Sequence, residues 1–420
     1  MDKIDILLVG GGGREHAIAQ KLRESARCGR LWAAPGNAGI SGIAECLPIG
    51  ATELDKIIAA AKELDIDCVF VAPDDPLALG LVDRLTEAGI RAFGPTAKAA
   101  ELEGSKVFSK GLMKKYGIPT ADYKVFDDPA QAMRYIEGRG VYPVVIKADG
   151  LALGKGAVIA SDRSEAETAL RSIMEEKTFG HSGDRVVVEE FLCGPELTVL
   201  AFTDGEIVAP MVSAQDYKRV FDGDNGPNTG GMGAISPSPY YTLELAERCE
   251  REIFLPTVRA MRSEGREFRG VIYFQMMLTP DGPKVIEYNA RFGDPEAQVV
   301  LPRMKTDLLD VIDAVIDGRL NEIAMEWDDG AAVCVCMASG GYPQKYEKGF
   351  PIEIPDFTDD ITVYHAGTAR RDGRLVTNGG RVLGVTAKGQ TVGDAAKKAY
   401  CAVAKIRFEG AHYRTDIGGM

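Results

Sequence analysis

The sequence predicts a multidomain protein of the α/β and α+β classes, with an N-terminal parallel sheet and a strand-rich C-terminal region. Its 420 residues exceed the length of one ordinary domain. Roughly the first hundred residues alternate short apolar strands with helical patterns, which is typical of a parallel sheet covered on both faces. Short apolar runs also gather after Trp327. We expect domains at residues 1–103, 104–325 and 326–420, with residues 121–190 forming a small lobe of the middle one.

The N-terminal elements are the clearest. Apolar runs predict strands at Ile4–Val9 and Cys68–Ala72, and helical patterns follow at Glu15–Arg23 and Leu77–Ala88. Ligands of parallel sheets bind at the carboxyl ends of the strands. The glycine loop at residues 10–13 lies at such an end and is therefore a candidate binding element.

The strands and helices of the rest of the chain are predicted from the same patterns. Residues 121–188 show the order strand, helix, strand, glycine loop, strand, helix, strand, and the chain closes with a predicted helix at residues 392–406. Between these segments the pattern indicates a larger mixed α/β region up to about residue 317.

Composition excludes several classes of function. Asp and Glu number 62 against 49 Lys and Arg, and the net charge of −13 opposes nucleic-acid binding. The eight cysteines form no C-x-x-C pair, and the four histidines lack zinc-site spacing. No apolar run approaches the roughly 18 residues of a membrane span, and no signal sequence is evident. We expect a cytoplasmic monomer or weak homodimer that contacts neither nucleic acid nor membrane.

The first glycine loop, residues 10–13, joins a strand to a helix. The dinucleotide fingerprint G-x-G-x-x-G fails, because its third glycine would fall on Glu15, which disfavours a nicotinamide cofactor. Glycines beside a helix N-terminus suit an anion. Two interpretations stay open for Gly12, Gly13 and Arg14: a phosphate or phosphosugar site, or a structural turn.

A second glycine-rich segment spans residues 149–156 between two predicted strands. It is not a P-loop, because Asp149 stands where the first glycine belongs and Gly156 replaces the Ser or Thr that holds magnesium. Lys147 and Lys155 bracket the glycines. This arrangement favours a flexible flap over nucleotide phosphates, with an ordinary hairpin as the alternative.

The apolar strand predicted at residues 186–188 ends in two acidic residues, Glu189 and Glu190. A plain strand end facing water is one interpretation. The other is a frame for adenosine, in which backbone groups of residues 190–192 hold the base and Glu196 holds the ribose hydroxyls. Magnesium or manganese is the metal expected next to such a nucleotide.

The most polar strand end carries Glu287 and Asn289. Residues two apart on a strand project from the same face, and a carboxylate with an amide oxygen suits magnesium. A solvated strand face is the alternative, but the strand is apolar before this point and Arg291, Asp294 and Glu296 crowd the same end. We therefore predict a metal site at Glu287 and Asn289.

A long polar stretch separates these segments, at residues 215–219 and 226–233. Long glycine-rich loops in compact domains are usually functional. This stretch supplies cations for a phosphate and amide donors for a carboxylate.

These motifs occur in a fixed order along the chain: GGREHA at 12–17, PGNAG at 35–39, KADGLALGKG at 147–156, GPNTGGMG at 226–233, NARFGDPE at 289–296, HAGT at 365–368 and GGRVL at 379–383. In this order the chain resembles the phosphoribosylamine–glycine ligase (glycinamide ribonucleotide synthetase) family of ATP-grasp enzymes over its whole length. One local departure is residues 273–276, Tyr-Phe-Gln-Met, where smaller residues such as Ala-Gly are expected.

The resemblance implies an ATP-grasp core between a preATP-grasp domain and a strand-rich C-terminal domain. Residues implied to bind ATP are Lys106, Lys147, Gly154, Lys155, Gly156, Glu189, Glu190, Phe191, Leu192 and Glu196. Residues implied to bind the acceptor substrates are Gly12, Gly13, Arg14, Asn37, Asp216, Lys218, Arg219, Asn228, Gly231, Arg291, Asp294 and Glu296. Catalytic roles are implied for Arg291, Asp294 and the flap residue Lys155, and the metal role for Glu287 and Asn289.

The implied reaction joins glycine to 5-phosphoribosylamine through glycyl phosphate, with cleavage of ATP to ADP and phosphate, in purine synthesis. Two alternatives stay open: another ATP-grasp carboxylate–amine or carboxylating ligase, and a non-catalytic nucleotide sensor. The GPNTGGMG stretch argues against the first. The joint presence of Lys147, Lys155, Glu287, Asn289 and Arg291 argues against the second. Asp294 and Asp216 are both candidates to accept the proton of the amine.

Overall fold

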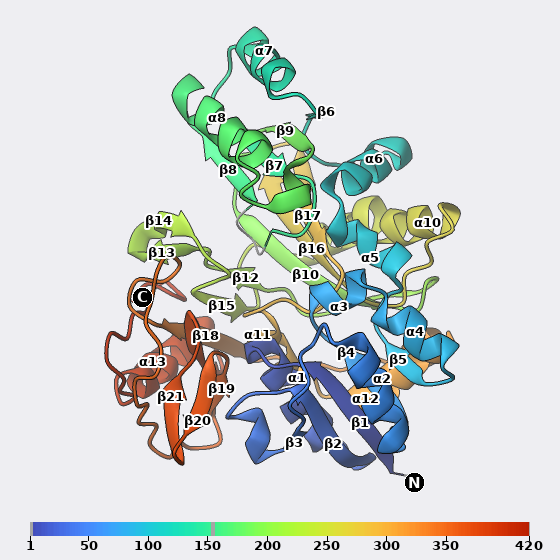
Figure 1. Ribbon diagram of the computed structural model, residues 1–420, viewed down its shortest axis with the longest axis vertical. Helices are drawn as coiled ribbons and strands as arrows, with labels where there is room; N and C mark the ends of the chain where they lie inside the picture. Colours follow the sequence, from blue (N-terminus) through green and yellow to red (C-terminus); the bar gives the residue numbers. More distant parts are fainter. Residues whose placement is uncertain (1–2, 153–155, 420) are drawn as a thin grey trace.

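Four bodies surround a central groove in the computed structural model, which describes residues 3–152 and 156–419 (Figure 1). The N-terminal sheet and the C-terminal sheet lie side by side at one end of the molecule, and a small lobe lies at the other end. A long antiparallel sheet lies between them. In the part of the chain that is described, no helix has the length and apolarity needed to cross a membrane.

The N-terminal body is a parallel sheet, as the sequence predicts; it has five strands in the order β3-β2-β1-β4-β5. Its strands are β1 (Ile4–Gly10), β2 (Cys28–Pro35), β3 (Glu45–Cys46), β4 (Cys68–Val71) and β5 (Arg91–Phe93). Its helices are α1 (Gly13–Glu24), α2 (Leu54–Glu63), α3 (Asp74–Ala78) and α4 (Leu81–Glu87).

The single helix predicted at residues 77–88 is wrong. The structure divides it into α3 and α4, and Gly80 between them has a φ of +82°. This left-handed conformation favours glycine and ends a right-handed helix. Helical propensity alone does not reveal such a break.

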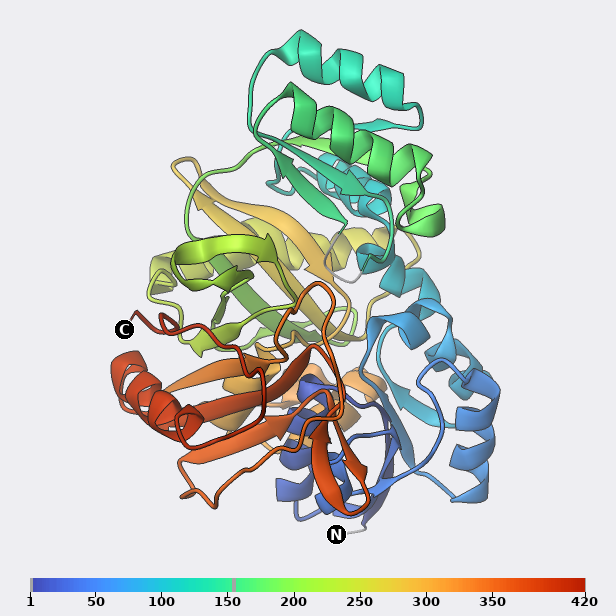
Figure 2. The same cartoon turned by 60° about the vertical axis from the view of Figure 1, so that its left-hand side comes forward.

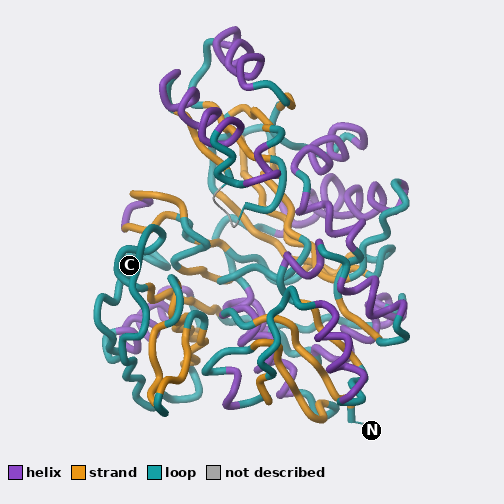
Figure 3. Tube along the Cα trace, in the orientation of Figure 1, coloured by secondary structure: helices purple, strands orange, loops and turns teal. Residues whose placement is uncertain are grey.

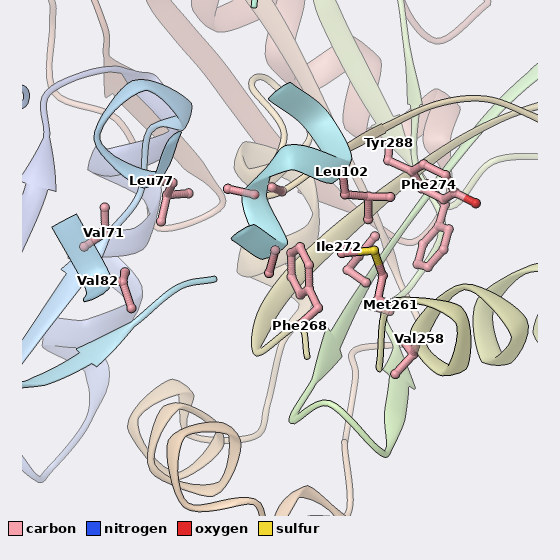
Figure 4. Packing of buried hydrophobic residues seen from close by; sticks show 14 of the residues in the cluster. Val71, Leu77, Val82, Leu102, Val258, Met261, Phe268, Ile272, Phe274 and Tyr288 are labelled. Atoms are coloured by element: carbon pink, nitrogen blue, oxygen red, sulfur yellow. The ribbon is translucent and has the colours of Figure 1, made fainter. Parts of the chain in front are cut away.

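Helix α5 (Ala97–Gly104) connects the N-terminal body to the rest of the molecule, and α6 (Lys106–Tyr116) follows at once. Figure 4 shows Val71 and Leu77 from the N-terminal body in the same apolar cluster as Leu102 of α5 and Ile272 and Phe274 of the central sheet. A continuous apolar core holds its elements in one arrangement. Helix α5 is therefore a rigid support for any side chain that it points at the groove.

The small lobe is a four-stranded antiparallel sheet in the order β6-β9-β7-β8. Its elements are β6 (Tyr123–Phe126), α7 (Pro129–Arg139), β7 (Val144–Ala148), β8 (Ala157–Ala160), α8 (Arg163–Leu170) and β9 (Val186–Glu190). The predicted order of strands and helices in this region is confirmed. Helices α7 and α8 pack against the sheet on its outer side (Figure 3).

The central body is a four-stranded antiparallel sheet in the order β11-β10-β16-β17. It contains β10 (Glu196–Thr203), β11 (Val208–Pro210), β16 (Gly270–Thr279) and β17 (Gly282–Asn289), with helices α9 (Leu243–Cys249), α10 (Leu255–Ser263), α11 (Ala297–Val300) and α12 (Leu308–Asp317). A polar hairpin, β13 (Arg219–Phe221) with β14 (Asn225–Asn228), projects beside this sheet.

The C-terminal sheet has the order β12-β15-β18-β22-β19. Its strands are β12 (Gln215–Asp216), β15 (Gly233–Ser236), β18 (Ala331–Ala338), β19 (Ile361–His365) and β22 (Arg381–Gly389); the hairpin β20 (Thr368–Arg371) with β21 (Arg374–Thr377) and helix α13 (Val392–Val403) complete this part. Strands β12 and β15 come from residues before 325, so this sheet ties the middle of the chain to its end. Figure 2 shows the C-terminal strands against the N-terminal body, where β19 contacts α1.

Candidate active site

A groove of about 780 Å³ lies between the small lobe, the central sheet and the two terminal bodies. Most predicted site residues line it: Arg14, Lys106, Lys147, Gly156, Glu189, Glu190, Phe191, Leu192, Glu196, Asp216, Lys218, Arg219, Asn228, Glu287, Asn289, Arg291, Asp294 and Glu296. Four others, Gly12, Gly13, Asn37 and Gly231, are not among its lining residues. Gly154 and Lys155 lie outside the described residues.

Three lysines gather at the small-lobe end of the groove, which we call the nucleotide end. Lys147 on β7 and Lys110 on α6 both contact Oε2 of Glu189, at 3.1 Å and 3.0 Å. Lys106 donates to the carbonyl oxygen of Gly150 in the glycine-rich hairpin at 2.9 Å. One carboxylate therefore serves two buried ammonium groups, which leaves this end of the groove positively charged.

The shared carboxylate of Glu189 is deeply buried. Its second oxygen, Oε1, has no hydrogen-bond partner among the described residues. Burial lowers the pKa of Lys110 to about 8, against the opposing attraction of Glu189. The sequence analysis did not select Lys110, because a lysine on an amphipathic helix normally faces solvent.

Glu196 lies at the start of β10, next to the segment at residues 189–192. Its Oε2 accepts hydrogen bonds from Gln275 Nε2 at 2.8 Å and from Lys218 Nζ at 3.2 Å. Its side chain remains 38% exposed to the groove. A carboxylate held in this way is available to hydroxyl groups of a bound ligand.

Glu287 and Asn289 occupy one face of β17, as the two-residue spacing predicts. Across the strand pair they lie opposite Gln275 and Tyr273 of β16, respectively. Burial would raise the pKa of Glu287, but nearby cations, Lys218 foremost, hold it below its ordinary value. The carboxylate is therefore ionised at neutral pH.

This pair of side chains suits a hard divalent cation. A carboxylate and an amide oxygen on one face are ligands that Mg²⁺ accepts while its other positions go to water and phosphate. Among the described residues, no group of three His, Cys, Asp or Glu side chains has the geometry of a protein-only metal site. The residues therefore fit a metal that is shared with a bound phosphate. The Oδ1 atom of Asn289 also accepts from Arg291 Nη2 at 2.9 Å.

Arg291 lies at the junction between the nucleotide end and the opposite, acceptor end. Its Nη2 contacts Glu103 Oε1 at 2.9 Å, and Glu103 also accepts from the backbone N–H of Ala290 at 2.7 Å. Burial disfavours the charged guanidinium, but the Glu103 carboxylate and other acids raise the pKa of Arg291 well above its usual range. Glu103 at the end of α5 thus holds both the charge and the orientation of Arg291.

The acceptor end is built around Asp294 and Arg381. Their side chains contact each other at 3.0 Å, and Arg381 Nη1 also donates to the carbonyl oxygens of Asp294 and Gly230, at 2.7 Å and 2.6 Å. Arg381 thereby connects the C-terminal sheet to the polar loop at residues 226–233. The Gly231 backbone has a φ of +114°, which favours glycine at this tight approach.

The two candidate proton acceptors differ in their electrostatics. Burial raises the pKa of Asp216 to about 7, with the acids Glu296 and Glu196 acting in the same direction and Lys218 opposing them. Burial would also raise the pKa of Asp294, but Arg381 and other donors lower it below its ordinary value. Asp216 is therefore the stronger base at neutral pH.

The N-terminal glycine loop lies directly behind Asp294. A methyl group placed on Gly12 would lie 3.6 Å from Asp294 Oδ2. The N–H of Gly12 already donates to Glu15 Oε2 at 2.6 Å, so a carboxylate of the chain itself occupies part of the loop. Asn37 donates to the carbonyl oxygens of Gly11 and His365, at 2.9 Å and 2.7 Å. This loop therefore packs against the acceptor end and connects it to the C-terminal body.

The ATP-grasp arrangement of a small lobe over a central sheet, with a lysine-rich groove and an oxygen-donor pair between them, defines an ATP-dependent ligase. The family profiles agree. The phosphoribosylglycinamide synthetase N, ATP-grasp (A) and C domains match residues 4–103, 104–297 and 332–420. The chain belongs to the phosphoribosylglycinamide synthetase family.

Individual relatives agree with this assignment. The chain is 50% identical over 416 residues to a phosphoribosylamine–glycine ligase of Halalkalibacterium halodurans, covering 99% of this chain and 96% of that protein. The crystal structure of the Thermotoga maritima phosphoribosylamine–glycine ligase superposes with a TM-score of 0.86 at 35% identity, covering 98% of this chain and 100% of that one.

A more distant structure shares only the fold. The biotin carboxylase domain of a Hydrogenobacter thermophilus 2-oxoglutarate carboxylase, solved with MgADP and bicarbonate, has a TM-score of 0.77 at 18% identity. It covers 98% of this chain and 92% of its own. The likeness supports the ATP-grasp fold and says nothing about the acceptor substrate.

Proposed function

We propose that the chain joins glycine to 5-phosphoribosylamine, with cleavage of ATP to ADP and phosphate, and that the whole reaction takes place in the groove described above. The observation that carries the proposal is the junction at Glu287, Asn289 and Arg291. On its nucleotide side lie lysines suited to a polyphosphate. On its acceptor side lie polar groups that are already oriented and suit small ligands. This placement brings an anionic acid and the γ-phosphate together at one point.

In this proposal the adenosine of ATP lies against residues 189–192, with its ribose at Glu196. The polyphosphate runs past Lys106 and Lys147 toward β17. Glu287 and Asn289 would hold Mg²⁺ or Mn²⁺ against the phosphates. When bound, the metal supplies charge neutralisation for the transferring phosphoryl group.

Glycine and phosphoribosylamine occupy the acceptor end. The glycine carboxylate attacks the γ-phosphorus, a new O–P bond forms, and the bond to ADP breaks. Arg291 stabilises the charge that spreads over the phosphoryl oxygens. The product of this step is glycyl phosphate.

The second step forms the amide. The amine of phosphoribosylamine attacks the glycyl carbonyl carbon, the C–O bond to phosphate breaks, and the amine loses a proton. We assign acceptance of this proton to Asp216, because its raised pKa lies near neutral pH. Asp294 and its partner Arg381 then act in orienting the acceptor rather than in proton transfer.

The test is ADP release by purified protein with ATP, magnesium, ribose 5-phosphate, ammonia and glycine, with each component omitted in turn. Phosphoribosylamine forms from ribose 5-phosphate and ammonia in that mixture without an enzyme. We expect release that requires both glycine and the ribose 5-phosphate–ammonia pair. Release that ignores glycine would reject the proposed acid substrate, and nucleotide binding without any turnover would reject a ligase in favour of a sensor.

A further inference from the structure

Strand β16 carries the segment that departs from the family resemblance, residues 273–276. Along this strand the side chains alternate between the groove and the core. Gln275 lines the groove, whereas Phe274 points to the other side, with its ring centroid 4.5 Å from that of Phe254. The two larger residues therefore lie on opposite faces of β16. Phe274 fills the apolar core, and Gln275 places an amide in the groove where a smaller residue is expected.

The amide of Gln275 has a specific partner. Its Nε2 lies 2.8 Å from Glu196 Oε2, and Lys218 Nζ lies 3.2 Å from the same oxygen. Among the described residues, no hydrogen bond joins Glu196 Oε1. Two donors thus hold one carboxylate oxygen, while the other is left for a ligand.

The position of Gln275 is itself well fixed. Only 2% of its surface is exposed. On one side it pairs with Thr198 of β10 and on the other with Glu287 of β17. A buried side chain between two strands loses little further entropy when a ligand binds, so its hydrogen bond preorganises the partner.

We propose that Gln275 is a positioning residue for nucleotide recognition in this chain. It holds Glu196 Oε2 so that Oε1 faces the ribose hydroxyls of the nucleotide. The proposal rests on the ribose-binding role of Glu196 in the proposed function. A neutral amide serves here because a second carboxylate would repel Glu196, and a cation would compete with the metal for Glu287, directly opposite.

The chemistry predicts a selective effect. A hydrogen bond to a charged group contributes more than one between neutral groups. Its loss frees the Glu196 carboxylate to rotate and weakens only those ligands that use it. A nucleotide that lacks ribose hydroxyls does not use Glu196, so its affinity does not depend on Gln275. A purely structural role of Gln275 would weaken both kinds of nucleotide equally.

The experiment compares the Kd of ADP with that of 2′,3′-dideoxy-ADP, both with magnesium, by titration calorimetry on the full chain. Gln275→Met keeps the side-chain volume and removes the donor. We expect the preference of the wild type for ADP over the dideoxy nucleotide to fall about fivefold in this variant, while the Kd of the dideoxy nucleotide is unchanged. Met276→Leu, one residue away and facing the core, is the matched control and keeps the preference.

Two further variants keep the test decisive. Gln275→Leu has no polar group and cannot donate, so it lowers the preference at least as much. In a Glu196→Gln background, Gln275→Met has no additional effect if the two residues act as one unit. An undiminished preference in Gln275→Met or, should that variant not fold, in Gln275→Leu overturns the proposal.

A wild-type protein without any preference for ADP overturns it as well, together with the ribose role of Glu196. Binding of ADP needs no turnover, so this result is independent of the ligase reaction. Glycine-dependent ADP release in the same preparation would still uphold the proposed function. The two failures are therefore distinguishable.

Discussion

The nucleotide end and the acceptor end of the groove neutralise their charges in different ways. At the nucleotide end, Lys110 and Lys147 share the single carboxylate of Glu189. At the acceptor end and the junction, two arginines each have a carboxylate of their own: Arg381 contacts Asp294 at 3.0 Å, and Arg291 at the junction contacts Glu103 at 2.9 Å. One end keeps an excess of positive charge, and the other is closed by ion pairs before any ligand arrives.

This difference matches the two kinds of ligand. A polyphosphate brings several negative charges and neutralises unpaired lysines as it binds. Glycine is a zwitterion without net charge and phosphoribosylamine carries a single phosphate, so the acceptor end has less charge to neutralise and depends more on donors and acceptors that already stand in the correct orientation. Residues at the two ends should therefore affect different kinetic constants, and residues at the junction should affect the rate of the chemical step.

The junction is expected to be the most sensitive point. Glu287→Gln keeps the shape of the side chain but removes the ionised ligand, so we expect kcat to fall about 1000-fold while circular dichroism stays unchanged. Glu206→Gln is the matched control, because that carboxylate pairs with Arg262 on an exposed surface outside the groove; its loss should change kcat by about threefold at most. A Glu287→Gln variant with near wild-type turnover would contradict the metal site.

Arg291 tests the junction from its other side. Arg291→Lys retains the charge and loses the guanidinium, whose Nη2 contacts Glu103 and Asn289 together, so we expect kcat to fall about 300-fold. The KM for ATP should stay within about twofold, because the lysines at the nucleotide end are intact. Steady-state kinetics measures both constants. A rise in the KM for ATP as large as the fall in kcat would mean that Arg291 belongs to the nucleotide end.

Asp216 gives the reaction its pH dependence. The carboxyl has a raised pKa of about 7, so it is protonated and inactive as a base below this pH and ionised above it. The rate should therefore rise with pH through about 7. Asp216→Asn should lose about 100-fold in kcat at pH 8 and flatten this limb of the profile. Asp294→Asn serves as the comparison, because the pKa of Asp294 is lowered and its loss should leave the limb in place.

The smallest effects should separate the two ends most cleanly. Arg381→Lys loses the fork that holds Asp294 and the carbonyl oxygen of Gly230, and we expect the KM for glycine and phosphoribosylamine to rise about tenfold with that for ATP unchanged. Lys110→Met removes the contacts of Lys110 with Glu189 and Thr120 at the nucleotide end, so it should raise the KM for ATP and leave those for glycine and phosphoribosylamine unchanged. If both variants change the same KM, the division of the groove into two ends is wrong.

Those parts of the fold and the site that depend on local sequence patterns are predictable from the sequence. The parallel sheet, the β7–β8 hairpin and the shared face of Glu287 and Asn289 all follow from the periodicity of short segments. The roles proposed for the site residues remain predictions. The break between α3 and α4 at Gly80 could not be predicted, because it depends on the φ angle of one residue inside a good helical pattern.

The residues that the sequence analysis missed are those that act through tertiary contacts. Glu103 meets Arg291 across 188 positions of the chain, and Arg381 meets the carbonyl oxygen of Gly230 across 151. Nothing near Glu103 in the sequence distinguishes it from an ordinary surface charge, and the GGRVL motif contains Arg381 but does not indicate its partners. Gln275 did leave a signal, since it stands out as too large for its position, but only the structure pairs it with Glu196.

Transfer of the γ-phosphoryl group to the glycine carboxylate at the junction of the two ends is the central step of the proposed reaction. The direct measurement uses glycine labelled with ¹⁸O in its carboxylate and follows the label by mass spectrometry after complete reaction. We predict that each phosphate released carries one ¹⁸O atom, because the C–O bond of glycyl phosphate breaks when the amine attacks. Phosphate without ¹⁸O would contradict glycyl phosphate as the intermediate and, with it, the roles assigned to the groove.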